Sequence, residues 1–242
     1  MNMPNSYDVI IIGAGPSGMF AALELVKSQP SLRIAMLEKG AIRKPGDWKS
    51  IISGWGGAGA FSDGKLTLSP LVGGHLLDFM PTDAFEELMR YVDSLYLQFG
   101  GDPDRLFGGE TPLVSELRRK SLAANLQLVT YQIRHLGTDK AYAIVENIRE
   151  HLQARGVEIA VNTEAVTVNH DADLFEVVCK TGDAGELAAF KGRYVILAPG
   201  REGAEWFVNE VKRLGLKMRN KGVDVGVRVE VPADTLNHIT EQ

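Results

Sequence analysis

The most constraining feature of the sequence is a glycine-rich turn that follows an apolar run near the amino end. Val9 to Ile12 are uninterruptedly apolar, which is typical of a strand buried on both faces of a parallel sheet. Gly13, Gly15 and Gly18 follow with the spacing GxGxxG, and residues 19–27 are compatible with a helix. In such a turn the first glycine permits a sharp exit from the strand, the second lets a pyrophosphate approach the backbone, and the third lets helix and strand pack closely. The amides and the dipole of the helix start then favour phosphate.

The next residues complete a dinucleotide-binding pattern. A second apolar run covers Arg33 to Leu37, and Glu38 follows it, 20 residues after Gly18. This separation is the one expected of a carboxylate that holds ribose hydroxyls. The same carboxylate would repel a 2′-phosphate on that ribose. An ordinary strand–helix–strand unit is the alternative, but the pattern favours an adenine dinucleotide. Its pyrophosphate would be held by Gly13, Gly15, Ser17 and Gly18, and Pro16 is expected to be a further cofactor-binding residue.

Composition and charge exclude several classes of partner. The chain has 242 residues, of which 45% are hydrophobic and 24% charged, as in ordinary globular proteins. Its formal net charge of −5 gives no footprint for nucleic acid. No apolar run approaches the roughly 18 residues that span a bilayer, and no signal-peptide pattern precedes the first strand, so a cytoplasmic location without a membrane partner is expected.

Cys179 is the only cysteine, which excludes an internal disulfide, and its alternating surroundings favour a packed strand residue. No metal site is expected.

A second glycine-rich segment covers residues 53–66, with five glycines among 14 residues. So many glycines disfavour the interior of a helix or strand. A flat cofactor that passes close to the backbone would keep such a segment ordered. A flexible surface loop is the alternative, against which the large apolar residues Trp55, Phe61 and Leu66 argue. The residues expected to line the cofactor here are Gly57, Ala58, Gly59 and Ser62.

Three stretches together resemble a known group of enzymes. Residues 11–19 (IIGAGPSGM), 37–40 (LEKG) and 54–66 (GWGGAGAFSDGKL) are similar to those of FAD-dependent dehydrogenases in the glutathione-reductase-like flavoprotein superfamily, particularly its NAD(P)/FAD-dependent oxidoreductases. The resemblance runs from about residue 7 to about residue 232. It implies a Rossmann-like α/β fold, with a central parallel sheet flanked by helices and an antiparallel β-meander. It also implies FAD as the cofactor, with NAD(P)H as a candidate electron donor.

The resemblance also assigns residues to the adenine end of the site. In these proteins the chain just after the third parallel strand contacts adenine through its backbone, and the matching position is about Glu164 to Val166. The apolar run Tyr194 to Leu197, followed by Ala198-x-Gly200, resembles a second FAD signature. Here Pro199 replaces the usual Thr, which removes a hydroxyl and an amide donor. Lys39, Val166, Ala198 and Gly200 complete the cofactor-binding residues that we expect.

Periodicity and turn residues predict the remaining elements. Amphipathic helices are expected over residues 82–99, 112–125 and 139–155. Their caps would be Thr82 or Asp83, then Thr111, and then Thr138 or Asp139. Strands are expected at residues 127–133, 157–161, 163–169, 174–180, 186–190, 194–197 and 223–231, and a further helix at residues 204–214.

We expect residues 1–232 to form one FAD-binding domain, with a helical insertion at about residues 67–137. Residues 233–242 would begin a substrate domain that is missing or truncated. The Gly-Asp pair that closes the FAD site in the resembled proteins has no fitting counterpart, and no second GxGxxG is present. One nucleotide site and weak FAD binding by the isolated chain are therefore expected.

The leading hypothesis is an FAD-binding oxidoreductase that exchanges a hydride or electrons with a small-molecule substrate or electron carrier. The alternatives are a nucleotide-binding fragment without turnover and a thiazole-synthase-like enzyme that binds an adenine dinucleotide. No catalytic residue is assigned. Asp63, Lys65 and His135 are candidates because polar groups near the glycine-rich segment could reach a flavin or substrate. Arg134 and His135 are hypothesised to line the far side of the flavin or to contact substrate, with surface packing as the alternative.

Overall fold

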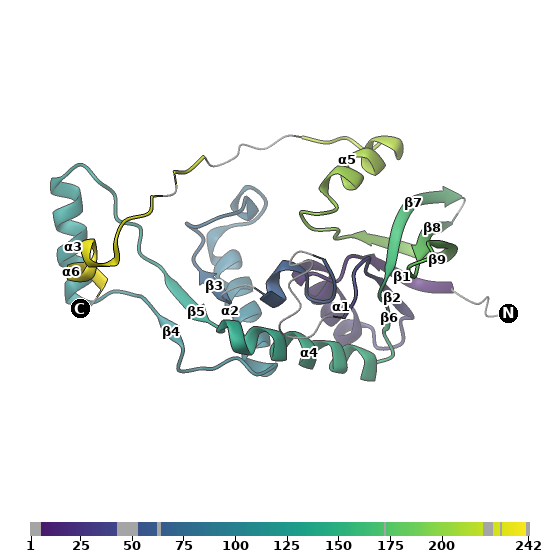
Figure 1. Cartoon of the computed structure of the whole chain (residues 1–242), viewed down its shortest axis with the longest axis horizontal. Helices are drawn as coiled ribbons and strands as arrows, with labels where there is room; N and C mark the ends of the chain where they lie inside the picture. The colour runs from purple at the N-terminus through teal and green to yellow at the C-terminus, as the bar shows by residue number, and fades with distance from the viewer. Residues whose placement is uncertain are drawn as a thin grey trace.

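The computed structural model describes residues 6–42, 53–61, 64–171, 173–219, 225–227 and 229–240 (Figure 1). Within these residues a six-stranded sheet has the order β6-β2-β1-β9-β8-β7, and a three-stranded sheet has the order β3-β5-β4. In the larger sheet β6, β2, β1 and β9 run parallel, whereas β9, β8 and β7 form an antiparallel meander. The predicted α/β architecture, a parallel sheet flanked by helices with a meander, is confirmed.

The elements have the following bounds. The strands are β1 (Ser6–Ile12), β2 (Ile34–Leu37), β3 (Lys65–Leu68), β4 (Leu106–Phe107), β5 (Gln132–His135), β6 (Glu158–Ala160), β7 (Thr163–Asp171), β8 (Leu174–Thr181) and β9 (Glu186–Leu197). The α-helices are α1 (Pro16–Ser28), α2 (Thr82–Gln98), α3 (Pro112–Ala123), α4 (Thr138–Ala154), α5 (Ala204–Arg213) and α6 (Asn237–Thr240). Short 3₁₀ helices are η1 (Gly57–Phe61), η2 (Leu76–Asp78) and η3 (Ala233–Thr235).

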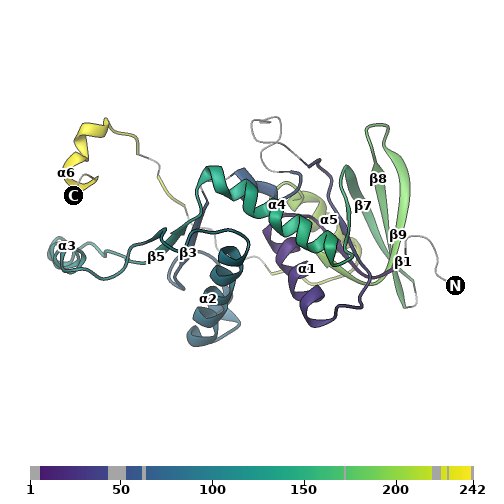
Figure 2. The same ribbon diagram turned by 90° about the horizontal axis from the view of Figure 1, so that it is seen from below.

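The apolar run of β1 serves two cores, one on each face of the parallel sheet. Val9 and Ile11 pack with residues of α1 and α4, which lie beside each other on one face (Figure 2). Ile10 and Ile12 point to the other face and pack with Val177 and further residues of the meander. Successive strand residues alternate between faces, so a strand covered on both sides must be apolar throughout. This explains why the run contains no polar residue.

Strand β9 differs from the prediction of two separate strands at 186–190 and 194–197. It is continuous over 12 residues, and it passes from antiparallel pairing with β8 to parallel pairing with β1. Gly192 permits this passage, because a Cβ there would lie 2.9 Å from Cγ1 of Ile10. The second part is also less buried than its apolar run suggests, since Tyr194 is 59% exposed.

The smaller sheet was not predicted as a unit. The β-prone stretch at 127–133 becomes strand only from Gln132, and β3 and β4 pair with it across long separations in sequence. The expected helical insertion thus contains strands as well as α2 and α3. Helix α3 carries no buried residue.

Two of the three expected caps are wrong. Thr111 caps α3 as predicted, because its hydroxyl accepts from the Val114 amide at 3.2 Å. Helix α2 has Pro81 at its N-cap and helix α4 has Gly137, neither with a side-chain hydrogen bond. Both helices therefore start one residue earlier than their candidate threonine caps allow.

The strand expected at 223–231 is absent from the described residues of that stretch, 225–227 and 229–231. Val225, Val227 and Val229 are 92%, 89% and 74% exposed. An alternating pattern becomes a strand only beside another strand that pairs with its backbone, and no described residue does so. None of the described helices combines the length and the apolar character needed to cross a bilayer.

Candidate functional site

The turn after β1 is closed by backbone-to-backbone contacts that only glycine allows. Gly13 has a φ of +102°, and a Cβ there would lie 2.1 Å from the carbonyl oxygen of Ala198. A Cβ on Gly18 would lie 2.0 Å from the carbonyl oxygen of Gly13, so this glycine lets α1 pack against the strand end. Helix α1 begins at Pro16, and its N-cap, Gly15, has no side chain to cap it. The first turn of α1 therefore faces the space beyond β1 with backbone amides, a favourable arrangement for an anion.

Glu38 is the buried carboxylate that ties this turn to two other segments. Its side chain is at the end of β2, and the residue is 6% exposed. Oε2 accepts the Ala14 amide at 3.0 Å, while Oε1 accepts the amides of Gly40 and Gly54 at 2.9 and 2.8 Å. Three backbone donors thus satisfy a charge that burial would otherwise penalise. The sequence predicts that Glu38 binds a ribose, but it does not predict that these three backbone amides donate to the same carboxylate.

The second glycine-rich segment lies directly on the first. Gly56 donates its amide to the carbonyl oxygen of Ala14 at 2.9 Å. A Cβ on Gly57 would come within 3.1 Å of the Gly15 Cα, so the two backbones touch. Trp55, 3% exposed, anchors the segment by donating its indole N–H to the Val145 carbonyl of α4 at 3.0 Å. The close backbone contact explains the excess of glycine, and the tryptophan explains why the segment is ordered.

These parts enclose one pocket of about 470 Å³ at the carboxyl ends of β1, β2 and β9. Ligands of open α/β sheets bind at this edge. Most of the predicted cofactor-binding residues line it, namely Gly13, Gly15, Pro16, Glu38, Lys39, Gly57, Ala58, Ala198 and Gly200.

The remaining predicted residues lie elsewhere. Ser17 and Gly18 belong to the first turn of α1 without lining the pocket, and Gly59 lines a smaller neighbouring cavity. Val166 does not line the pocket, although its neighbours Glu164 and Ala165 do. Ser62 and Asp63 lie outside the described residues.

Sequence reasoning missed one wall of the pocket. Thr163 at the start of β7 and Arg201, Glu202 and Trp206 after β9 all line it. Lys39 and Glu202 form an ion pair of 2.9 Å between the ends of β2 and β9, and both side chains are about one-third exposed (32% and 33%). The strand-end rule could have indicated the residues after β9, because β9 is parallel to β1.

Trp206 holds helix α5 against the meander near the pocket. Its indole N–H donates to the Val166 carbonyl at 2.8 Å. Val166 lies where the pairing register of β7 and β8 shifts, a bulge that leaves its carbonyl available for this bond. The predicted adenine contact by this segment would therefore come from its neighbours, Glu164 and Ala165, more readily than from the Val166 carbonyl.

Arg134 corrects one sequence hypothesis. It is 5% exposed, and its guanidinium donates to both carboxylate oxygens of Asp93 at 2.9 and 2.8 Å and to the carbonyls of Asp102 and Pro103. The neighbouring carboxylate raises the pKa of Arg134 further above its ordinary value. With its donors engaged in this way, Arg134 joins β5 to α2 and is not available to a flavin or substrate.

His135 and Lys65 lie opposite each other in the pairing of β5 and β3. Nη2 of Arg105 is 2.8 Å from Nδ1 of His135, and because a guanidinium only donates, the imidazole proton must be on Nε2. The described structure brings neither residue to the larger pocket, and Lys65 lines the smaller cavity. Cys179 is fully buried, and burial raises the pKa of its thiol to about 12, which agrees with a packed strand residue.

Comparison with one solved structure, at a TM-score of 0.53, supports the fold. No protein-family model matches the chain. An uncharacterized protein of Clostridium beijerinckii is 26% identical over 242 residues, which cover 94% of this chain and 37% of that protein. The solved 3-ketosteroid-Δ4-(5α)-dehydrogenase of Rhodococcus jostii RHA1 has 18% identity and a TM-score of 0.53, over 81% of this chain and 46% of that one. A flavoprotein/dehydrogenase of Cytophaga hutchinsonii has 15% identity and a TM-score of 0.48, over 90% and 44%. The chain thus spans less than half the length of each of these three proteins.

Proposed function

We propose that this chain is the FAD-binding part of an oxidoreductase. The observation that supports this most is the pocket in which the backbone of Gly13, Gly15 and Gly57 meets the Glu38 carboxylate. Its volume of about 470 Å³ is within the usual range of ligand pockets, about 300–1,000 Å³. Solved chains of similar fold carry the names of a dehydrogenase and a flavoprotein, which agrees with the proposal without fixing a substrate.

The pocket offers suitable chemistry for each part of the adenosine diphosphate half of FAD. The pyrophosphate would lie over Gly15, where no atom comes within 4 Å of a Cβ position, so space is open above the backbone. The adenine would lie near Glu164 and Ala165 at the far wall. When bound, FAD would supply the transfer of a hydride or of electrons, while the chain binds and orients it.

Glu38 could accept few hydrogen bonds from the ribose. An ionised carboxylate has about four acceptor positions, and backbone amides occupy three of them. Glu38 would therefore accept one ribose hydroxyl while it continues to hold the turn. We further propose NAD(P)H as electron donor and a small molecule or electron carrier as the other reactant.

A pair of glycine substitutions tests the proposal. Gly15 has a φ of −76° and free space at its Cβ, so Gly15→Ala should leave the fold intact while a methyl group obstructs the pyrophosphate. Gly226→Ala is the matched control, because a Cβ there also meets nothing within 4 Å and the residue lines neither pocket. We expect FAD titration, followed by flavin fluorescence, to show an affinity at least about tenfold lower for Gly15→Ala, equal to about 1.4 kcal/mol.

The outcomes separate the alternatives. FAD binding by Gly226→Ala should equal that of the original chain. Equal FAD affinity in all three proteins, or none in the original chain, would overturn the proposal. A colourless chain that retains an ADP-ribose compound and does not bind FAD would favour the thiazole-synthase-like alternative. FAD bound without reduction by any tested donor would favour a nucleotide-binding role without turnover.

A further inference from the structure

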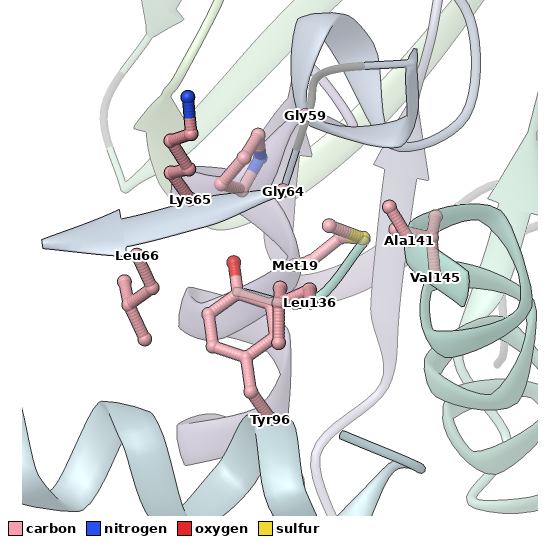
Figure 3. Close-up of a pocket in the computed structure, with 10 residues that line it drawn as sticks. Met19, Gly59, Gly64, Lys65, Leu66, Tyr96, Leu136, Ala141 and Val145 are labelled. Carbon is pink, nitrogen blue, oxygen red and sulfur yellow. The ribbon is translucent and has the colours of Figure 1, made fainter. Parts of the chain in front are cut away.

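A second cavity of about 170 Å³ adjoins the larger pocket at Pro16, and Figure 3 shows the residues that line this smaller cavity. Pro16 lines both, and a Cβ on Gly59 would lie 3.0 Å from the Pro16 Cγ, so these two residues form the partition. Helices α1, α2 and α4 and strand β3 surround the cavity. Its apolar walls include Met19, Ala141 and Val145, which are 1%, 3% and 5% exposed.

Tyr96 of α2 brings a polar group to these apolar walls. Figure 3 shows its hydroxyl directed up toward β3 and Met19, whereas the Lys65 ammonium points away from it. Its ring is held by Phe20, with the ring centroids 5.3 Å apart. Among the described residues the hydroxyl has no hydrogen-bond partner. Burial raises the pKa of Tyr96, so it stays a neutral phenol that can both donate and accept.

Such an arrangement leaves the Tyr96 hydroxyl available to a ligand that enters the cavity. A bound water needs two to four polar partners, which walls of this composition supply poorly. Apolar cavities of about 150 Å³ admit a benzene-sized molecule, and this one has about 170 Å³.

We propose that this cavity binds a small, uncharged, apolar group that carries one hydroxyl or carbonyl oxygen, which pairs with the Tyr96 hydroxyl. A charged group would be disfavoured, because the ammonium of Lys65 is directed away from the cavity and the other described lining residues bear no charge. Its role as the site of the apolar part of the substrate rests on the proposed function, since FAD would then lie across the partition. The binding itself requires no cofactor.

The test uses phenol and benzene as probes on the full chain, with binding measured by ligand-observed NMR in the absence of FAD. These probes differ by one hydroxyl. We expect phenol to bind with a dissociation constant on the order of 1 mM and several-fold more tightly than benzene. Tyr96→Phe should remove this preference, weakening phenol by up to about tenfold and leaving benzene unchanged. Tyr91→Phe is the matched control, because that hydroxyl lies on the same helix but bonds Lys27 and Glu24 at the surface.

A second variant fills the cavity. Ala141→Leu adds three carbons at a wall position on α4, and it should abolish the binding of both probes. Equal affinity for phenol and benzene, or phenol binding that survives both variants, would overturn the inference. Repeating the titrations with FAD separates the two claims: phenol binding without FAD binding would reject only the proposed function, and FAD binding without phenol binding would reject only this cavity.

Discussion

The parallel sheet region and the β3–β5–β4 region are held together by different kinds of contact. Around the larger pocket, backbone lies on backbone: Cβ atoms on Gly13, Gly18 and Gly40 would fall 2.1, 2.0 and 2.4 Å from backbone atoms of other segments. The smaller sheet has one such approach, since a Cβ on Gly108 would lie 2.3 Å from the carbonyl oxygen of Tyr131, but its link to α2 is a side-chain pair, Arg134 of β5 with Asp93. Backbone contact fixes the residue type at each position, whereas a side-chain pair can be replaced by another pair of similar shape.

The two regions also differ in burial. Five of the seven residues of β1 are buried, the exceptions being Ser6 and Asp8, and its apolar residues serve two cores. Helix α3, by contrast, exposes Leu113, Leu117 and Leu122 at 45%, 40% and 63%. We therefore expect the parallel sheet region to tolerate few substitutions. Substitutions in the β3–β5–β4 region should lower the stability of the protein but leave the larger pocket intact.

The largest expected effect is that of Gly13→Ala. The φ of +102° and the 2.1 Å approach to the Ala198 carbonyl oxygen leave no room for a methyl group. We expect a loss of about 5 kcal/mol in the free energy of unfolding, or failure to fold, together with loss of FAD binding. Urea denaturation followed by circular dichroism measures this, with Gly15→Ala as control. A stable, FAD-binding Gly13→Ala protein would break the contrast between the regions.

Arg134→Met comes next. It leaves the Asp93 carboxylate buried without its partner, which should lower the free energy of unfolding by about 4 kcal/mol. Replacing both partners, as Arg134→Met with Asp93→Leu, should recover part of this loss, because no uncompensated charge remains. FAD titration of the double variant should match the original chain. A double variant that folds but does not bind FAD would show that the two regions depend on each other.

Glu210→Gln tests a set of side-chain hydrogen bonds inside the parallel sheet region. Glu210, 4% exposed, accepts from Arg213 and from the Val168 amide, and these contacts hold the pKa of its carboxyl below the ordinary value of 4.5. The folded state therefore gains stability from Glu210 above about pH 4.5, and the gain disappears as the pH falls through the lowered pKa. We expect a loss of about 2 kcal/mol at pH 7. Denaturation curves should converge with those of the original chain in acid, and a constant difference would contradict this.

The smallest effect is expected for Lys39→Met. Its ion pair with Glu202 is about one-third exposed, and such pairs contribute less than about 1 kcal/mol. Stability should fall by that amount at low salt and by less at 1 M salt, because ions screen exposed charges. The same measurement on Glu202→Gln should give the same result. A large effect from either variant would mean that this pair, and not the backbone, closes the pocket.

Local patterns were sufficient to predict the β1–α1–β2 unit and the place of Glu38 at the end of β2, because these signals lie close together in the sequence. The smaller sheet could not be predicted from local patterns, because β4 has only two residues and α3 lies between β4 and β5 in the sequence. Trp206 was missed for a similar reason, because it reaches the pocket only once β9 lies beside β1. Arg134 was misjudged because its partner Asp93 is 41 residues away in sequence. A sequence pattern shows which residues can pair, but long-range contacts decide which do.

The three amides that surround the Glu38 carboxylate have a consequence for how a ligand would arrive. Ala14, Gly40 and Gly54 come from three separate segments, and the amides of all three donate to one side chain of the protein itself. Their amide hydrogens should therefore exchange slowly with deuterium in the ligand-free chain. The binding site would then be preorganised, so that binding costs little conformational entropy. The association rate would be set by diffusion and orientation rather than by refolding of the loops.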